Sequence, residues 1–121
     1  MVSAHNVHHD LYRGPKLLTD PGDAGTIVVN EDLQICEMVS ATAETRTLAA
    51  PTKPGIRLIL RMKTDGGDIT LTAAAGLNVA LDTTATFAEA SDLLSLISVT
   101  LTATTYRWEV LEGNVATTIG A

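Results

Sequence analysis

The feature that most constrains the fold of this sequence is the alternation of apolar and polar residues over residues 57–74, "RLILRMKTDGGDITLTAA". A period of two places every second side chain on the same face of a β-strand. The first run therefore has one apolar face, made of Ile56, Leu58, Leu60 and Met62. A turn at residues 64–68 follows, and its two glycines suit a tight reversal. The pattern predicts two antiparallel strands joined as a hairpin.

The same alternation recurs along the chain from residue 26 onward. Short strands are predicted near residues 26–29, 33–41, 45–48, 56–63, 69–74, 93–103, 106–112 and 115–119. In the second of these runs the prominent apolar residues are Leu33, Ile35, Val39 and Ala41. No segment shows a convincing long helical pattern. We therefore predict an all-β fold, a single β-sandwich or jelly-roll-like domain.

The first 25 residues differ from the rest in composition and pattern. They are rich in His, Asp, Gly and Pro and have neither helical nor strand periodicity. We predict an extended N-terminal arm over residues 1–25 and a β domain over residues 26–121. No segment is apolar enough for a signal peptide or a bilayer span, so a soluble protein made in the cytoplasm is expected, with no membrane partner.

Charge and cysteine content narrow the possible partners. Eight Lys and Arg residues stand against 14 Asp and Glu, a net charge of −6. Without a basic cluster to neutralise phosphates, nucleic acid is not expected as a partner. The single cysteine, Cys36, lies in the apolar run "LQICEMV" and is predicted to be a small buried hydrophobe rather than a nucleophile.

Two segments carry residue types that can bind metals. The N-terminal "HNVHHD" contains His5, His8, His9 and Asp10, but a structural metal site needs ligands held on a scaffold, which this segment lacks. The turn "DGGD" offers the carboxylates of Asp65 and Asp68, fewer than a calcium loop requires. We interpret "HNVHHD" as part of a polar arm and "DGGD" as a turn between strands. We therefore expect the protein to bind no metal and no cofactor.

The sequence contains no recognisable catalytic arrangement. There is no Gly-x-Ser-x-Gly, the histidines all lie in the predicted arm, and no glycine-rich loop opens a helix. An enzyme is therefore not expected. Tyr106 and Trp108 share one face of a predicted strand, where two aromatics could stack on a sugar or a base. Such pairs more often belong to the core, and we predict a core position.

Three segments together resemble a known class of proteins. In order they are "RTLAAPTKPGIRLILRMKTDGGDITLTAA", "ATFAEASDLLSLISV" and "YRWEVLEGNVATT". Over about residues 45–118 the chain is similar to small structural proteins of tailed bacteriophages, in particular capsid decoration or cement proteins. The resemblance implies a structural virion protein on the capsid surface that binds the major capsid protein and associates as a homotrimer. It also implies capsid contacts from the arm, for which the candidate residues are His5, His8, His9, Tyr12, Arg13 and Leu17.

Two other functional classes remain open. One is a carbohydrate- or receptor-binding β module of a phage fibre or tail, for which an exposed face of Tyr106 and Trp108 would be the distinguishing feature. The other is an enzyme of unrecognised type, which would need a concave pocket with convergent titratable groups.

Overall fold

Ten β-strands make up the regular structure of the described residues. The computed structural model describes residues 16–77 and 82–119, and none of these residues forms a helix. The strands are β1 (Lys16–Leu18), β2 (Gly25–Ile27), β3 (Gln34–Val39), β4 (Glu44–Leu48), β5 (Arg57–Thr64), β6 (Ile69–Thr72), β7 (Asp82–Phe87), β8 (Leu93–Thr100), β9 (Tyr106–Gly113) and β10 (Ala116–Ile119). The predicted all-β class is confirmed.

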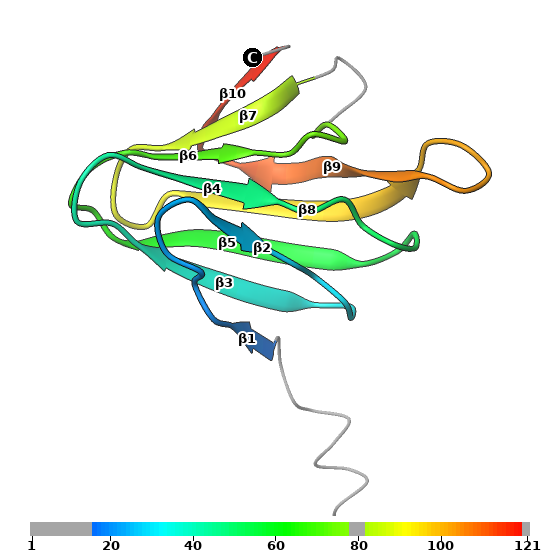
Figure 1. Ribbon diagram of the computed structural model, residues 1–121, viewed down its shortest axis with the longest axis horizontal. Helices are drawn as coiled ribbons and strands as arrows, with labels where there is room; N and C mark the ends of the chain where they lie inside the picture. Colours follow the sequence, from blue (N-terminus) through cyan, green and yellow to red (C-terminus); the bar gives the residue numbers. More distant parts are fainter. Residues whose placement is uncertain (1–15, 78–81, 120–121) are drawn as a thin grey trace, which may run out of the picture.

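The strands form two five-stranded mixed sheets that share one core (Figure 1). Sheet 1 has the order β1-β3-β5-β8-β9, and sheet 2 has the order β10-β7-β6-β4-β2. The first six strands alternate between the sheets, so the chain makes three successive turns of a flattened coil. Within this coil β1, β3 and β5 pair in parallel, as do β2, β4 and β6. The crossover that each parallel pair requires is the strand in the other sheet.

The predicted hairpin at residues 64–68 is wrong. β5 pairs with β3 and β8 in sheet 1, whereas β6 pairs with β4 and β7 in sheet 2. The turn is therefore an arch that carries the chain from one sheet to the other. Alternation looks the same in both cases, because it reports which face of a strand is buried and not which strand lies beside it.

The glycines of this arch are needed for close approach rather than for positive φ angles. A Cβ on Gly66 would overlap the carbonyl oxygen of Ser40, and one on Gly67 would overlap the carbonyl carbon of Thr42. Neither glycine has a positive φ. The arch between β5 and β6 therefore stacks directly on the arch between β3 and β4.

The core is built from the inward faces of both sheets. The predicted dry face of β5 and the apolar face of β6 are fully buried, and Trp108 on β9 is 0% exposed. The Trp108 indole Nε1 donates a hydrogen bond to the carbonyl oxygen of Ala49, which follows β4 in sheet 2 (3.0 Å). Trp108 therefore belongs to the core, as predicted, and its polar atom links the two sheets.

On β3 the buried face differs from the apolar pattern of the sequence. Cys36 and Met38 are buried together with the polar residues Gln34 and Ser40, while Ile35 and Val39 point outward. The buried polar groups have partners: the Ser40 hydroxyl donates to the carbonyl of Gly67 (2.6 Å), and the Gln34 side-chain oxygen accepts the Asn30 amide (3.3 Å). Burial of these polar groups is tolerated because they are hydrogen-bonded.

The folded body begins earlier than the sequence indicated. β1 and the first residue of β2 lie within residues 1–25, and β1 pairs with β3 from Lys16 to Leu18. Residues 16–18 and residue 25, within the predicted arm, therefore lie in strands. Strands of three residues are too short to show a period. His5, His8, His9, Asp10, Tyr12 and Arg13 lie outside the described residues.

Candidate functional surface

A buried arginine holds the arches together at one end of the molecule. The Arg46 side chain on β4 is 0% exposed. It donates to both carboxylate oxygens of Asp20, from Nε (2.8 Å) and from an Nη (3.1 Å), and to Glu44 (3.0 Å). It also donates to the backbone carbonyl of Val39 (3.1 Å). Because Asp20 lies between β1 and β2 while Val39 and Glu44 lie on β3 and β4, this network joins the first two turns of the coil and is structural.

The ionisation of this pair follows from two opposing effects. Burial raises the pKa of Asp20, but hydrogen bonds from Arg46, Val39 and Gly22 outweigh it and leave the pKa below its ordinary value. Burial likewise lowers the pKa of Arg46, and its hydrogen bonds to Asp20 and Glu44 raise it by more. Both groups are therefore charged at neutral pH.

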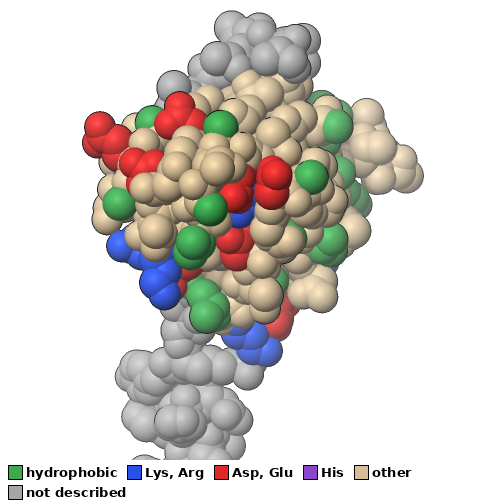
Figure 2. Space-filling model, turned by 60° about the vertical axis from the view of Figure 1, so that its left-hand side comes forward, with side chains coloured by type: hydrophobic (Ala, Val, Ile, Leu, Met, Phe, Trp, Pro, Cys, Tyr) green, Lys and Arg blue, Asp and Glu red, His purple; other side chains and the backbone are tan. Residues whose placement is uncertain are grey.

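Acidic side chains gather around this end of the molecule, which Figure 2 brings forward. A shallow hollow of ≈ 590 Å³ lies there, lined by Asp23, Ala24, Ala43, Glu44, Thr45, Asp68 and Thr70. Within residues 16–77 and 82–119, no three His, Cys, Asp or Glu side chains are grouped so that they could hold a metal ion. In the arch, Asp65 accepts the amide of Gly67 (3.2 Å), and the backbone carbonyl of Asp68 accepts the amide of Glu44 (2.9 Å). These contacts give the arch residues a structural role.

Cys36 has the properties of a core residue. Its side chain is buried in β3, and it is a free thiol. Burial raises the pKa of Cys36 to about 11, with a smaller contribution from the negative charge of Asp20. The thiol is therefore protonated at neutral pH and is a poor nucleophile.

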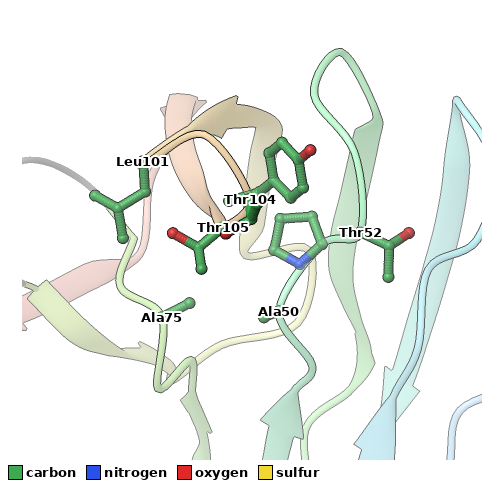
Figure 3. Close-up of a pocket in the computed structure, with 8 residues that line it drawn as sticks. Ala50, Thr52, Ala75, Leu101, Thr104 and Thr105 are labelled. Atoms are coloured by element: carbon green, nitrogen blue, oxygen red, sulfur yellow. The ribbon is translucent and has the colours of Figure 1, made fainter.

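The aromatic pair on β9 is divided between the core and a surface hollow. Trp108 is fully buried, whereas Tyr106 is partly exposed and borders a hollow of ≈ 520 Å³. Figure 3 shows Ala50, Ala75, Leu101 and Thr105 around this hollow, from three different connections. The lining residues carry no charged side chain. A sugar-binding module would expose both aromatic rings on this face. Here Tyr106 is partly exposed and Trp108 is buried.

The outer face of sheet 1 carries a group of apolar side chains. In the register of the sheet, Leu17 lies beside Ile35, and Ile35 lies beside Ile59. Ile59 is opposite Ser95 on β8, so Leu93 and Ile97 are its diagonal neighbours. Leu17 is 68% exposed and the other four are partly exposed. We call these five residues the sheet 1 patch: Leu17, Ile35, Ile59, Leu93 and Ile97.

Charged side chains border the sheet 1 patch, and six of them form three ion pairs, two between neighbouring segments and one within β9. The three ion pairs are Arg57–Asp32 (2.9 Å), Arg61–Glu37 (2.8 Å) and Arg107–Glu109 (3.2 Å). Through its hydrogen bonds with Arg57, Asp32 has its pKa lowered to about 2. Pairing removes much of the net charge from this face. An apolar centre within a paired polar border has the composition of a protein–protein contact surface.

Of the six predicted capsid-contact residues in the arm, Leu17 alone falls within the residues that the structure describes. It lies on β1, the edge strand of sheet 1, and is the most exposed member of the sheet 1 patch. The sequence pattern places Ile59 on the wetter face of its strand, with Arg57 and Arg61, but does not identify Ile35 or Ile97 as surface residues, because an apolar residue in an alternating run carries no sign of which face is covered. The polar residues Gln34 and Ser98 on the buried faces of β3 and β8 are the only indication of this reversal.

Comparisons with known proteins add no family assignment. No family model matches the chain, and a search of curated proteins finds no match. Among the described residues there is no helix long and apolar enough to cross a membrane.

Proposed function

We propose that the chain is a structural virion protein that decorates a phage capsid and stabilises it by binding capsomers. In this proposal it associates as a homotrimer on the outer capsid surface, binds the major capsid protein and catalyses no reaction. The observation that carries the proposal is the sheet 1 patch within its border of paired charges. The resemblance of residues 45–118 to capsid decoration proteins is the reason for proposing a phage capsid as the assembly that the chain binds.

For the architecture, we propose a β-sandwich, jelly-roll-like in having two facing sheets joined by crossing connections. The N-terminal segment extends from it as an arm. The arm enters the body at β1, on the same sheet as the patch. His5, His8, His9, Tyr12 and Arg13 are its proposed capsid contacts, together with Leu17 at the boundary between arm and body.

The partner that we assign to the sheet 1 patch is a second copy of the chain. Five strands spaced by about 4.8 Å give a face roughly 20 Å wide. The six residues of β3, at about 3.3 Å each, give a length of roughly 20 Å, so the face measures about 400 Å², half of the ~800 Å² per partner found in stable protein interfaces. An arm laid across a neighbouring copy or across the shell would contribute the remaining area. Many weak sites of this kind on one particle bind with high avidity.

The test uses the full-length chain and two variants that each place a lysine on an outer face. Ile59→Lys changes the centre of the sheet 1 patch, and Thr47→Lys is the matched control on the outer face of sheet 2. Light scattering measures the oligomer, and co-sedimentation measures binding to undecorated phage shells. We expect Ile59→Lys to yield monomers and to lose most shell binding, while Thr47→Lys behaves as the unchanged chain.

Each possible result decides a different part of the proposal. If the unchanged chain is monomeric, the proposed self-association is wrong. A control without shells checks that the unchanged chain does not sediment by itself. Failure of the unchanged chain to bind shells would overturn the decoration function itself.

The carbohydrate- or receptor-binding module is the alternative, and one observation favours it. Tyr106 offers a partly exposed ring beside an uncharged hollow, which is the setting in which aromatic rings contact sugars. The same hollow lacks any charged or amide side chain that would fix the orientation of a sugar. We therefore rank this function second.

A further inference from the structure

The outer face of sheet 2 consists of threonines in two rows. The first row contains Thr26 on β2, Thr47 on β4, Thr72 on β6 and Thr84 on β7, each directly beside the next in the register of the sheet. The second row, two residues away along the strands, contains Thr45, Thr70 and Thr86. Thr118 on β10 continues the first row in register. We call the seven residues Thr26, Thr45, Thr47, Thr70, Thr72, Thr84 and Thr86 the threonine face.

The residues between the threonines are buried, which shows that the threonine side chains point outward. Arg46, Leu71 and Ala85 lie between the threonines on β4, β6 and β7, and all three are buried. The threonines themselves are exposed or partly exposed. Three neighbouring strands thus repeat the sequence Thr-x-Thr in register, with the middle residue in the core.

Sheet geometry gives the threonine face two regular spacings. Neighbouring strands are about 4.8 Å apart, and two residues along a strand cover about 6.7 Å. Threonine is β-branched and stiff at χ1, so its hydroxyl and methyl groups keep fixed positions on each strand. We therefore expect the threonine face to present hydroxyl and methyl groups at regular intervals.

Chemistry restricts what such a lattice could bind. Neither row contains a charged residue, in contrast to the three ion pairs on the outer face of sheet 1. Six hydroxyls, those of Thr26, Thr45, Thr47, Thr70, Thr72 and Thr86, make no hydrogen bond to another described group of the protein. The ligand that would bind this face most favourably is therefore neutral, rich in hydrogen-bonding groups and itself periodic.

Size and composition exclude two other occupants. Three strand spacings by two rows measure roughly 14 by 7 Å, far less than the ~800 Å² per partner of a stable protein interface. The threonine rows alone therefore offer less area than the face of sheet 1, to which the proposed function assigns the second copy. No aromatic side chain lies in either row to stack on a sugar ring, which weakens the case for a polysaccharide.

We propose that the threonine face binds ice. Water oxygens along the a axis of hexagonal ice repeat at nearly the interval between neighbouring β-strands, so one row of hydroxyls can occupy successive lattice positions. The methyl groups between them hinder water from adopting other hydrogen-bonded arrangements. This inference is independent of the virion function, because it concerns the opposite face of the molecule.

The test measures how the full-length chain partitions into growing ice. A polycrystalline ice layer is grown slowly in a solution of the chain and albumin, and both proteins are quantified in the ice and in the liquid. We expect enrichment of the chain in ice over albumin. Thr47→Lys, at the second position of the first row, should reduce it to the albumin level, and Thr47→Ser should restore part of it by keeping the hydroxyl.

A matched control separates ice binding from folding. Thr100→Lys makes the same change at an exposed threonine of sheet 1 and should partition as the unchanged chain does. Circular dichroism and urea unfolding check that each variant is folded. Exclusion of the unchanged chain from ice would overturn the proposal, as would equal losses in Thr47→Lys and Thr100→Lys. Binding to crystalline cellulose or chitin without enrichment in ice would also overturn it.

Discussion

The carboxylate of Asp20 accepts two hydrogen bonds from the buried guanidinium of Arg46, at 2.8 and 3.1 Å. Asp20 lies between the first two strands, so this contact fixes the first arch to β4. Removing the carboxylate by Asp20→Ala leaves the buried charge with Glu44 as its only ionic partner. We predict a loss of about 3 kcal/mol in the free energy of unfolding, measured with urea.

An exposed pair of the same residue types serves as the control for this prediction. Arg57 and Asp32 also form two side-chain hydrogen bonds, but both side chains are about half exposed. Asp32→Ala should therefore cost less than about 1 kcal/mol. Equal losses in the two variants would show that burial of Arg46 is unimportant for stability.

The same pair predicts the response of stability to acid. The pKa of Asp20 is lower in the folded protein than in the unfolded chain, so its contribution is fully present above pH about 3.9. It is lost as the pH falls through the folded-state pKa. We predict that the difference in urea midpoint between the unchanged chain and Asp20→Asn is large at neutral pH and shrinks below about 3.9. A difference that stays constant to lower pH would contradict this linkage.

Stacking of the two arches predicts different costs for two glycine substitutions. Gly67→Ala forces a methyl group into the backbone of Thr42 and Ala43, which we expect to cost about 3 kcal/mol. Gly55 has a φ of 82° and open space around its missing Cβ, so Gly55→Ala should cost only about 1 kcal/mol. Urea unfolding of both variants measures the difference. A cost for Gly67→Ala no greater than that for Gly55→Ala would mean that the arches can separate.

The division between Trp108 and Tyr106 predicts opposite outcomes for their truncation. Trp108→Ala should cost about 3 to 5 kcal/mol because it empties a fully buried site and leaves the Ala49 carbonyl without its donor. Tyr106→Ala should change the melting temperature far less. On a glycan array, binding by the unchanged chain that Tyr106→Ala abolishes would favour the carbohydrate-binding module over a capsid protein.

Several strands could be predicted from the sequence because their alternation has a physical cause. The dry face of β5 and the two-residue period of β6 follow directly from burial on one side. Pairing could not be predicted in the same way. Nothing within residues 57–74 distinguishes a hairpin from an arch, because the difference is made by Gly66 and Gly67 packing on Ser40 and Thr42, far away in the sequence.

The candidate surface was less predictable than the core. On β3 and β8 the inward positions include Gln34, which accepts the amide of Asn30 four residues away, and Ser98, which accepts the amide of Ile56 from a distant part of the chain. Hydrophobicity alone therefore assigns Ile35 and Ile97 to the buried face of sheet 1, whereas they lie on its outer face. The resemblance places Leu17 in the arm, and its position on β1 next to Ile35 depends on a parallel pairing that three residues cannot reveal.

The most direct measurement of the central claim is an image of decorated phage shells at a resolution that shows the β-sheets. We predict three copies around each site on the outer shell surface, with the sheet 1 patch of one copy covered by its neighbour and the N-terminal segment in contact with a capsomer. Shells that carry no added density, or copies whose sheet 1 patches all face solvent, would contradict it.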